Sequence, residues 1–267
     1  MLANTESSGN YWKSSIQSTI VSHCLNETAS FTPSWVTSSD TFTAFLNIVL
    51  PGAKLESQRQ RIAAQYPCTA SPYYGDYRLC IATVIRDSSF TCNTRDLYSA
   101  YPDMAHMMQF GFPTAFHAVH AADLVALFAN NYEEAVDILQ KNHVPFPGPE
   151  LFANLLIDTH VALAYQTYFA SFALSGGDPN ILEMPQVPNG NPPTWPVADG
   201  SSGDELRKVL TVRNPSGQPA FVLGQADDKN SKKACNFWTE IAEEVVATQK
   251  ATDVVEDGEK WVYSNEL

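Results

Sequence analysis

The sequence contains no run of apolar residues long enough to span a bilayer as a helix. Basic residues are also few, because 16 Lys and Arg stand against 29 Asp and Glu, for a net charge of -13. Such a chain repels the phosphates of a nucleic acid, which excludes nucleic-acid binding as a function class. The opening residues, MLANTESSGNYWKSS, lack the basic start and apolar middle of a signal peptide, so we expect no export signal.

Several motifs of catalysis and cofactor binding are absent. The chain has no G-x-S-x-G turn to present a nucleophilic serine and no HGGG stretch for an oxyanion hole. The candidates LSGGDP (174–179) and DGSSGD (199–204) do not fit, since no apolar strand precedes them. A phosphate loop, a dinucleotide fingerprint and an HExxH helix are missing as well. We therefore expect no cofactor.

The five cysteines form no C-x-x-C pair, and no histidines lie at zinc-ligand spacing. We therefore expect no metal site. An odd number leaves at least one thiol unpaired within the chain, either as a small buried residue or with a partner elsewhere. The sequence does not fix the pairing of Cys24, Cys68, Cys80, Cys92 and Cys235.

Strand patterns are few. STIVS, residues 18–22, is short and rich in β-branched residues, and HMMQFGF, residues 106–112, is apolar and closed by Pro113. LRKVLTV, residues 206–212, alternates like a half-buried strand. These three segments are the predicted strands.

Helical periodicity is more frequent than strand alternation. Pro149 suits the first turn of the longest pattern, and Gly176 suits its end. The predicted helices cover residues 40–49, 53–65, two pieces of 77–101 that break near 88–91, 123–130, 149–174 and 231–250.

Helices mixed with a few strands indicate the α/β class. A doubly wound sheet usually shows more strands in regular alternation, so the pattern resembles the helical end of such a fold. We treat residues 1–267 as a single partial domain and expect the acidic end, residues 251–267, to fray.

The stretch AVHAADLVALF, residues 118–128, raises the question of a catalytic base. His120 follows the predicted strand at 106–112. A histidine at this place is either a hydrogen-bonded residue at a strand end or a general base, because its pKa near neutrality suits proton transfer. His117 is an alternative for the same role, and Asp123 is expected to cap the following helix.

Six segments together carry a resemblance to a known family. The chain resembles the C-terminal part of type B carboxylesterases, the fungal esterase and lipase branch of the cholinesterase-like α/β hydrolases. The likeness runs from about residue 16 to about residue 248, through segments in the family's order: STIVSHCLNETASFTP, IAAQYP, IRDSSFTCNTRDLYSAY, FGFPTAFHAVHAADLVALF, FALSGGDPN with TWP, and ACNFW.

The resemblance implies an α/β-hydrolase fold and ester hydrolysis through an acyl-enzyme. Glu27 matches the family's triad carboxylate, and His120 matches the histidine of its His-Gly-x-Asp motif, with Asp123 as the aspartate. The family order is serine, acid, histidine. The serine and the oxyanion-hole glycines are therefore expected upstream of residue 1, in a missing N-terminal half. Small-molecule or lipid esters are the implied substrates of the full-length form.

The chain departs from the family pattern in two further ways. Ala121 replaces the usual glycine after the histidine, and His117 competes for the role of His120. Family members are largely secreted, which favours a disulfide between Cys92 and Cys235 over two buried thiols and implies an extracellular location.

Three functions remain in contention from the sequence. The first is an esterase or lipase lineage in which this chain supplies acid and histidine but is inactive alone, because nucleophile and oxyanion hole are absent. The second is a non-catalytic binding protein or remnant that keeps part of the fold. The third is an unrelated helical interaction protein that mimics these segments.

Overall fold

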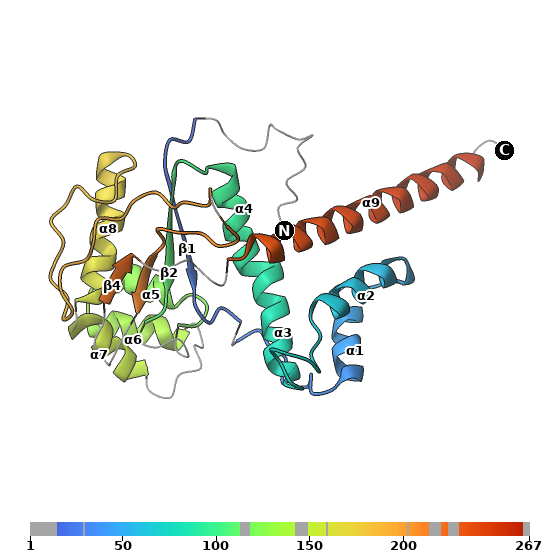
Figure 1. Ribbon diagram of the computed structural model, residues 1–267, viewed down its shortest axis with the longest axis horizontal. Coiled ribbons are helices and arrows are strands. Elements are labelled where there is room, and N and C mark those ends of the chain that lie inside the picture. The colour runs from blue at the N-terminus through green and yellow to red at the C-terminus, as the bar shows by residue number, and fades with distance from the viewer. Residues whose placement is uncertain are drawn as a thin grey trace.

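A four-stranded sheet lies at the centre of the protein (Figure 1). The computed structural model describes residues 15–28, 30–112, 118–141, 149–158, 160–201, 203–213, 220–223 and 230–263. Strand order is β1-β2-β3-β4, with β1, β2 and β3 parallel and β4 antiparallel to β3. The strands are β1 (Thr19–Cys24), β2 (Ala105–Phe110), β3 (Leu210–Arg213) and β4 (Ala220–Leu223).

Helices form two groups on either side of this sheet in Figure 1. One group holds α5 (Ala122–Phe128), α6 (Tyr132–Lys141), α7 (Pro149–Asp158) and α8 (Val161–Ser175). The other holds α1 (Ser39–Val49), η2 (Ala53–Leu55), α2 (Glu56–Gln65), α3 (Tyr77–Arg86), the π-helical turn η3 (Asp87–Thr91), α4 (Cys92–Ala100) and α9 (Lys232–Tyr263).

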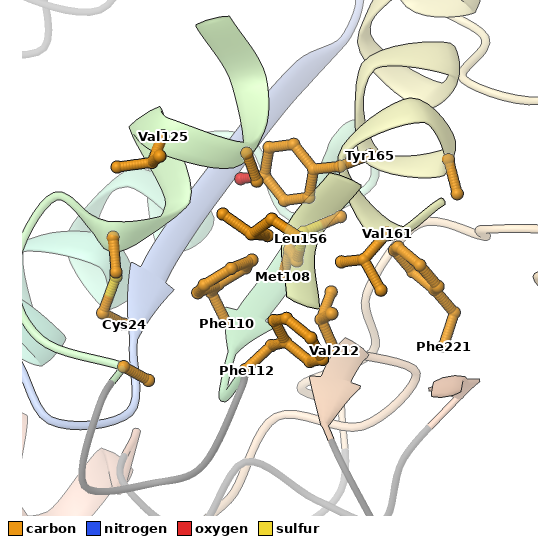
Figure 2. Close-up of a cluster of buried hydrophobic side chains, with 14 of the residues drawn as sticks. Cys24, Met108, Phe110, Phe112, Val125, Leu156, Val161, Tyr165, Val212 and Phe221 are labelled. Carbon is orange, nitrogen blue, oxygen red and sulfur yellow. The ribbon is translucent and has the colours of Figure 1, made fainter. Parts of the chain in front are cut away.

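The central strand β2 is buried along its whole length, as expected for a strand with covered faces and two neighbours. Because side chains alternate along a strand, Met108 and Phe110 pack with α5–α8 while Met107 packs on the opposite face with Tyr98 of α4. Figure 2 shows Met108 and Phe110 beside Leu156 of α7 and Tyr165 of α8. This first cluster is called the sheet core below.

A second core lies among α1, α2, α3 and α9. It contains Phe42 and Leu46 of α1, Ile62 of α2, and Trp238 and Ile241 of α9. Four of the five cysteines belong to it as well. This cluster is called the helical core below.

Local signals explain where several helices begin and end. Ser38 and Thr41 form a capping box at the start of α1, and the Asp76 side chain accepts from the backbone of Leu79 at the start of α3. Gly176 ends α8 in the left-handed conformation, with φ of 77°. The predicted helix ends at these places are confirmed.

All three predicted strands form, but two details differ. The strand predicted over 206–212 begins only at Leu210, because Lys208 has a positive φ of 58° that interrupts the extended backbone. β4 was not predicted, although AFVL is a short apolar run after Pro219. The fold is helix-rich with a small mixed sheet and is compatible with the α/β class.

The prediction of a single helix over 149–174 is wrong. The segment forms α7 and α8, which are separated at His160, whose φ is 58°. Apolar residues continue on both sides and neither glycine nor proline marks the break, so the sequence carries no local signal for it. The break lets α7 pack on α6 while α8 packs on α5. Fraying of residues 251–267 stays a prediction.

Candidate functional site

The carboxyl ends of β1 and β2 bring two distant segments together. The amide of Leu25 donates to the carbonyl of Phe110 at 2.8 Å, and the amide of Asn26 donates to the carbonyl of Ala118 at 2.8 Å. A parallel bridge between Asn26 and Val119 continues this pairing beyond the strands. Each segment then places one polar side chain at the same edge of the sheet.

Those side chains are Glu27 and His120, which lie 93 residues apart in the chain. Oε2 of Glu27 lies 2.7 Å from Nδ1 of His120, which is a short, charge-assisted hydrogen-bond distance. Oε1 of Glu27 accepts from the amide of Cys24 at 2.6 Å, so the carboxylate is held at both oxygens. Its side chain is only 7% exposed.

The His120 side chain is far more open, at 47% exposed. Glu27 occupies Nδ1, which leaves Nε2 as the nitrogen available to a reacting group. The hydrogen bond to the Glu27 carboxylate raises the pKa of His120 above its usual value, and the charges of Glu27 and Asp123 add to this, while burial opposes it. The arrangement therefore favours the imidazolium and makes His120 a stronger base.

Two phenylalanines form an aromatic cluster with the imidazole. The ring centroid of His120 lies 5.2 Å from that of Phe31 and 5.1 Å from that of Phe90, and the two phenyl rings are 5.5 Å apart. The sequence predicted no site role for either residue. Spacing within the chain offers no signal for this cluster, since its members come from three separate segments.

An apolar groove of about 660 Å³ opens beside this aromatic cluster. Phe31 and Phe90 both line it, and the remaining walls come from α1, α2, α3, η3 and α9. Leu46 and Val49 of α1 and Val245 of α9 are among the lining residues. The groove can therefore hold an apolar chain close to His120.

Asp123 does not cap α5, so that prediction is wrong. The helix is preceded by Ala121, which provides no side-chain cap, and Asp123 lies inside the first turn. The buried carboxylate instead accepts from the hydroxyl of Ser22 at 2.6 Å and lies 3.5 Å from the sulfur of Cys24. Asp123 thus ties the first turn of α5 to β1.

Ala121 adopts the left-handed conformation, with φ of 67°. Only glycine enters this region without a steric penalty. The requirement explains why a glycine is usual after the histidine in the family that the sequence resembles. The substitution by alanine therefore leaves the turn intact but strained.

The cysteines form two disulfides, Cys68–Cys80 and Cys92–Cys235. Cys24 is free and buried, which confirms one of the two alternatives for the odd thiol. Burial, followed by the nearby charges of Asp123 and Glu27, raises the pKa of the Cys24 thiol well above its usual value. A thiol held protonated in this way is a poor nucleophile.

Other sequence predictions have different outcomes. His117 lies outside the described residues, so its role as an alternative to His120 stays a prediction. Within the described ranges, no group of three or more His, Cys, Asp or Glu side chains is placed to hold a metal ion. No helix in the part of the chain that the structure describes is long and apolar enough to cross a membrane.

Comparison with known proteins gives one informative match. No family model matches the chain. A secreted lipase from Arthroderma benhamiae is 26% identical over 235 residues, which are 87% of this chain and 39% of the lipase. The chain thus spans about two-fifths of the length of this curated relative. The match supports a lipase- or esterase-like lineage with partial homology.

Proposed function

We propose that Glu27 and His120 are the acid and the base of a serine carboxylic ester hydrolase of the type B carboxylesterase group. The observation that carries the proposal is the 2.7 Å contact between Oε2 of Glu27 and Nδ1 of His120. It occurs where two parallel strands end, which is a common location of catalytic residues in α/β proteins. The lipase match is the second support.

In this mechanism Nε2 of His120 accepts the proton of a serine hydroxyl as the serine oxygen attacks the ester carbonyl. Glu27 holds the proton on Nδ1, fixes the ring orientation and stabilises the imidazolium that forms. His120 then donates its proton to the departing alcohol, which leaves an acyl-enzyme that water hydrolyses by the same route.

The nucleophile of this mechanism comes from a polypeptide segment outside the 267 residues, since the sequence contains no nucleophile elbow. The apolar groove beside Phe31 and Phe90 supports esters with an apolar acyl or alkyl chain as substrates. Two disulfides, together with the secreted relative, support action outside the cell.

The test compares the 267-residue chain with a polypeptide extended by the in-frame sequence upstream of Met1, using p-nitrophenyl butyrate. We expect turnover by the extended form alone. In that form His120→Ala and Glu27→Gln each lower kcat by about 10⁴-fold, whereas His160→Asn, a change in an exposed histidine elsewhere, leaves it unchanged.

The outcomes separate the proposal from its rival. A folded, extended polypeptide that carries a serine elbow but hydrolyses no ester contradicts the proposal and favours a non-catalytic binding protein. Full activity of the His120→Ala variant shows that another residue acts as the base. His117→Ala is then the variant to examine next.

A further inference from the structure

The π-helical turn η3 interrupts an otherwise continuous helix between α3 and α4. Its five residues, Asp87–Thr91, widen the helix locally, and the Thr91 hydroxyl donates to the carbonyl of Arg86, five residues earlier. Turns of this kind cost stability relative to a regular helix and recur at functional sites. The side chain that η3 directs toward the candidate site is Phe90, against both His120 and Phe31.

The first end of η3 is anchored to α9 by a buried chain of hydrogen bonds. The indole of Trp238 donates to the hydroxyl of Tyr66 at 2.7 Å, and that hydroxyl donates to Oδ2 of Asp87 at 3.0 Å. Asp87 is 4% exposed and also accepts from Arg86 at 2.8 Å. Asp87 therefore cannot shift without breaking buried polar contacts.

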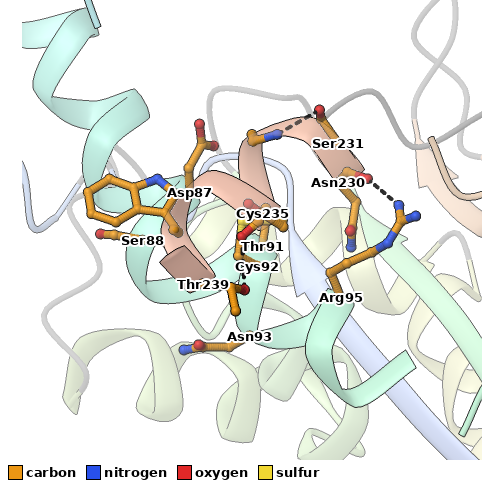
Figure 3. Close-up of a disulfide and its surroundings, with 12 residues drawn as sticks. Asp87, Ser88, Thr91, Cys92, Asn93, Arg95, Asn230, Ser231, Cys235 and Thr239 are labelled. Carbon is orange, nitrogen blue, oxygen red and sulfur yellow. Dashed lines mark hydrogen bonds between the residues drawn. A yellow bond between two sulfur atoms is a disulfide. The ribbon is translucent and has the colours of Figure 1, made fainter. Parts of the chain in front are cut away.

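The other end of η3 is anchored to α9 covalently. Cys92 follows the turn directly and forms a disulfide with Cys235, as Figure 3 shows beside Thr91 and Asp87. Cys92 and Cys235 are both buried. Phe90 thus lies between two fixed points, one of them a hydrogen-bond chain and the other a covalent bond.

We propose that Phe90 is a positioning residue for His120, and that η3, clamped at both ends to α9, is the device that holds it in place. Glu27 fixes one nitrogen of the imidazole but leaves the ring free to tilt about that hydrogen bond. The rings of Phe31 and Phe90, which also pack against each other, form a cluster with the imidazole and block its tilt toward them. This inference rests on the proposed function, because it assigns Phe90 to the orientation of the proposed base.

The readout is the low-field NMR signal of the proton shared between Nδ1 of His120 and Glu27, with its rate of exchange with water. In the 267-residue chain, we expect Phe90→Ala to accelerate this exchange by roughly tenfold, the scale of lost ring contacts. Phe90→Tyr, which keeps the ring, restores slow exchange. Phe172→Ala is the matched control, since Phe172 packs edge-on against a different histidine, His106.

A second pair of variants tests the clamp. Tyr66→Phe removes the hydroxyl between Trp238 and Asp87, and we expect a smaller acceleration in the same direction. Tyr168→Phe is its control, because the Tyr168 hydroxyl donates to the carbonyl of Pro193 away from η3. Unchanged exchange in a folded Phe90→Ala variant contradicts the positioning role, and unchanged exchange in Tyr66→Phe contradicts the clamp.

Kinetics in the extended polypeptide separate this inference from the proposed function. If the extended form hydrolyses esters, Phe90→Ala lowers kcat, and it raises KM as well because Phe90 also lines the apolar groove. If the extended form hydrolyses no ester while Phe90→Ala still accelerates exchange of the shared proton with water, the proposed function fails and the restraint of the His120 ring by Phe90 stands. Unchanged kcat and unchanged proton exchange in Phe90→Ala overturn the inference and leave the proposed function intact.

Discussion

At the scale of single residues, the candidate site depends on a few side chains whose surroundings are unusual. Glu27 is buried yet hydrogen-bonded at both oxygens, and His120 is half exposed yet fixed at one nitrogen. Ala121, the next residue, holds a backbone conformation that favours glycine. The Ala121 backbone and the Glu27–His120 hydrogen bond each lead to a prediction.

Relief of strain at Ala121 is the first prediction. Ala121→Gly removes the steric penalty that a Cβ atom has in the left-handed conformation. Glycine also gives the unfolded chain more conformational freedom, which offsets part of this gain. We therefore expect the free energy of unfolding to rise by about 0.5–1 kcal/mol. Ala82→Gly, in the regular helix α3, costs about 1 kcal/mol instead. Urea denaturation measures both, and destabilisation by Ala121→Gly contradicts the assigned turn.

The pKa of His120 gives the second prediction. Since the hydrogen bond to the Glu27 carboxylate is the main cause of the raised pKa, Glu27→Gln lowers the pKa of His120 in an NMR titration. A pKa higher in the folded than in the unfolded chain stabilises the fold fully below the unfolded value of about 6.5. That stabilisation is lost as the pH rises through the folded pKa. The stability difference between wild type and His120→Asn therefore shrinks from pH 5 to pH 9, and an unchanged difference contradicts the ion pair.

At the scale of elements, the sequence predicted the three strands and most helices because apolar periodicity and capping residues are local signals. It also placed Glu27 and His120 as acid and base candidates, through the family resemblance rather than through periodicity. It missed the break at His160 and the position of Phe90. The break at His160 depends on how α7 and α8 pack on α6 and α5, and the position of Phe90 depends on segments far apart in the chain. One-dimensional patterns record neither.

The two disulfides join elements over very different distances, which gives the third prediction. Cys92–Cys235 spans 143 residues and Cys68–Cys80 spans 12. In the chain-entropy model, loops of these lengths correspond to about 5 and about 3 kcal/mol of stabilisation. Replacing each pair by alanine and unfolding in urea measures the two costs. The entropic account is contradicted if the shorter loop proves the more costly to open.

At the scale of the whole molecule, the protein has two apolar clusters, the sheet core and the helical core. Both disulfides lie in the helical core, and the free Cys24 lies in the sheet core. The candidate site lies between the two groups of helices, because His120 precedes α5 while Phe90 and the apolar groove belong to the other group. The geometry around His120 thus depends on how these clusters are held together.

The last prediction follows from the unequal distribution of cross-links. In the Cys92→Ala/Cys235→Ala variant, we expect faster amide exchange in α1, α2 and α9, because the helical core loses its long-range bond. Exchange in β2 and α8, which belong to the sheet core, stays near the wild-type rate. Cys24→Ala is the control, since it removes a buried side chain from the sheet core and reverses the pattern. Amide exchange that accelerates equally across all elements in both variants means that the two cores open as one cooperative unit. In that case the restraint on Phe90 comes from the whole fold rather than from α9 and its disulfide.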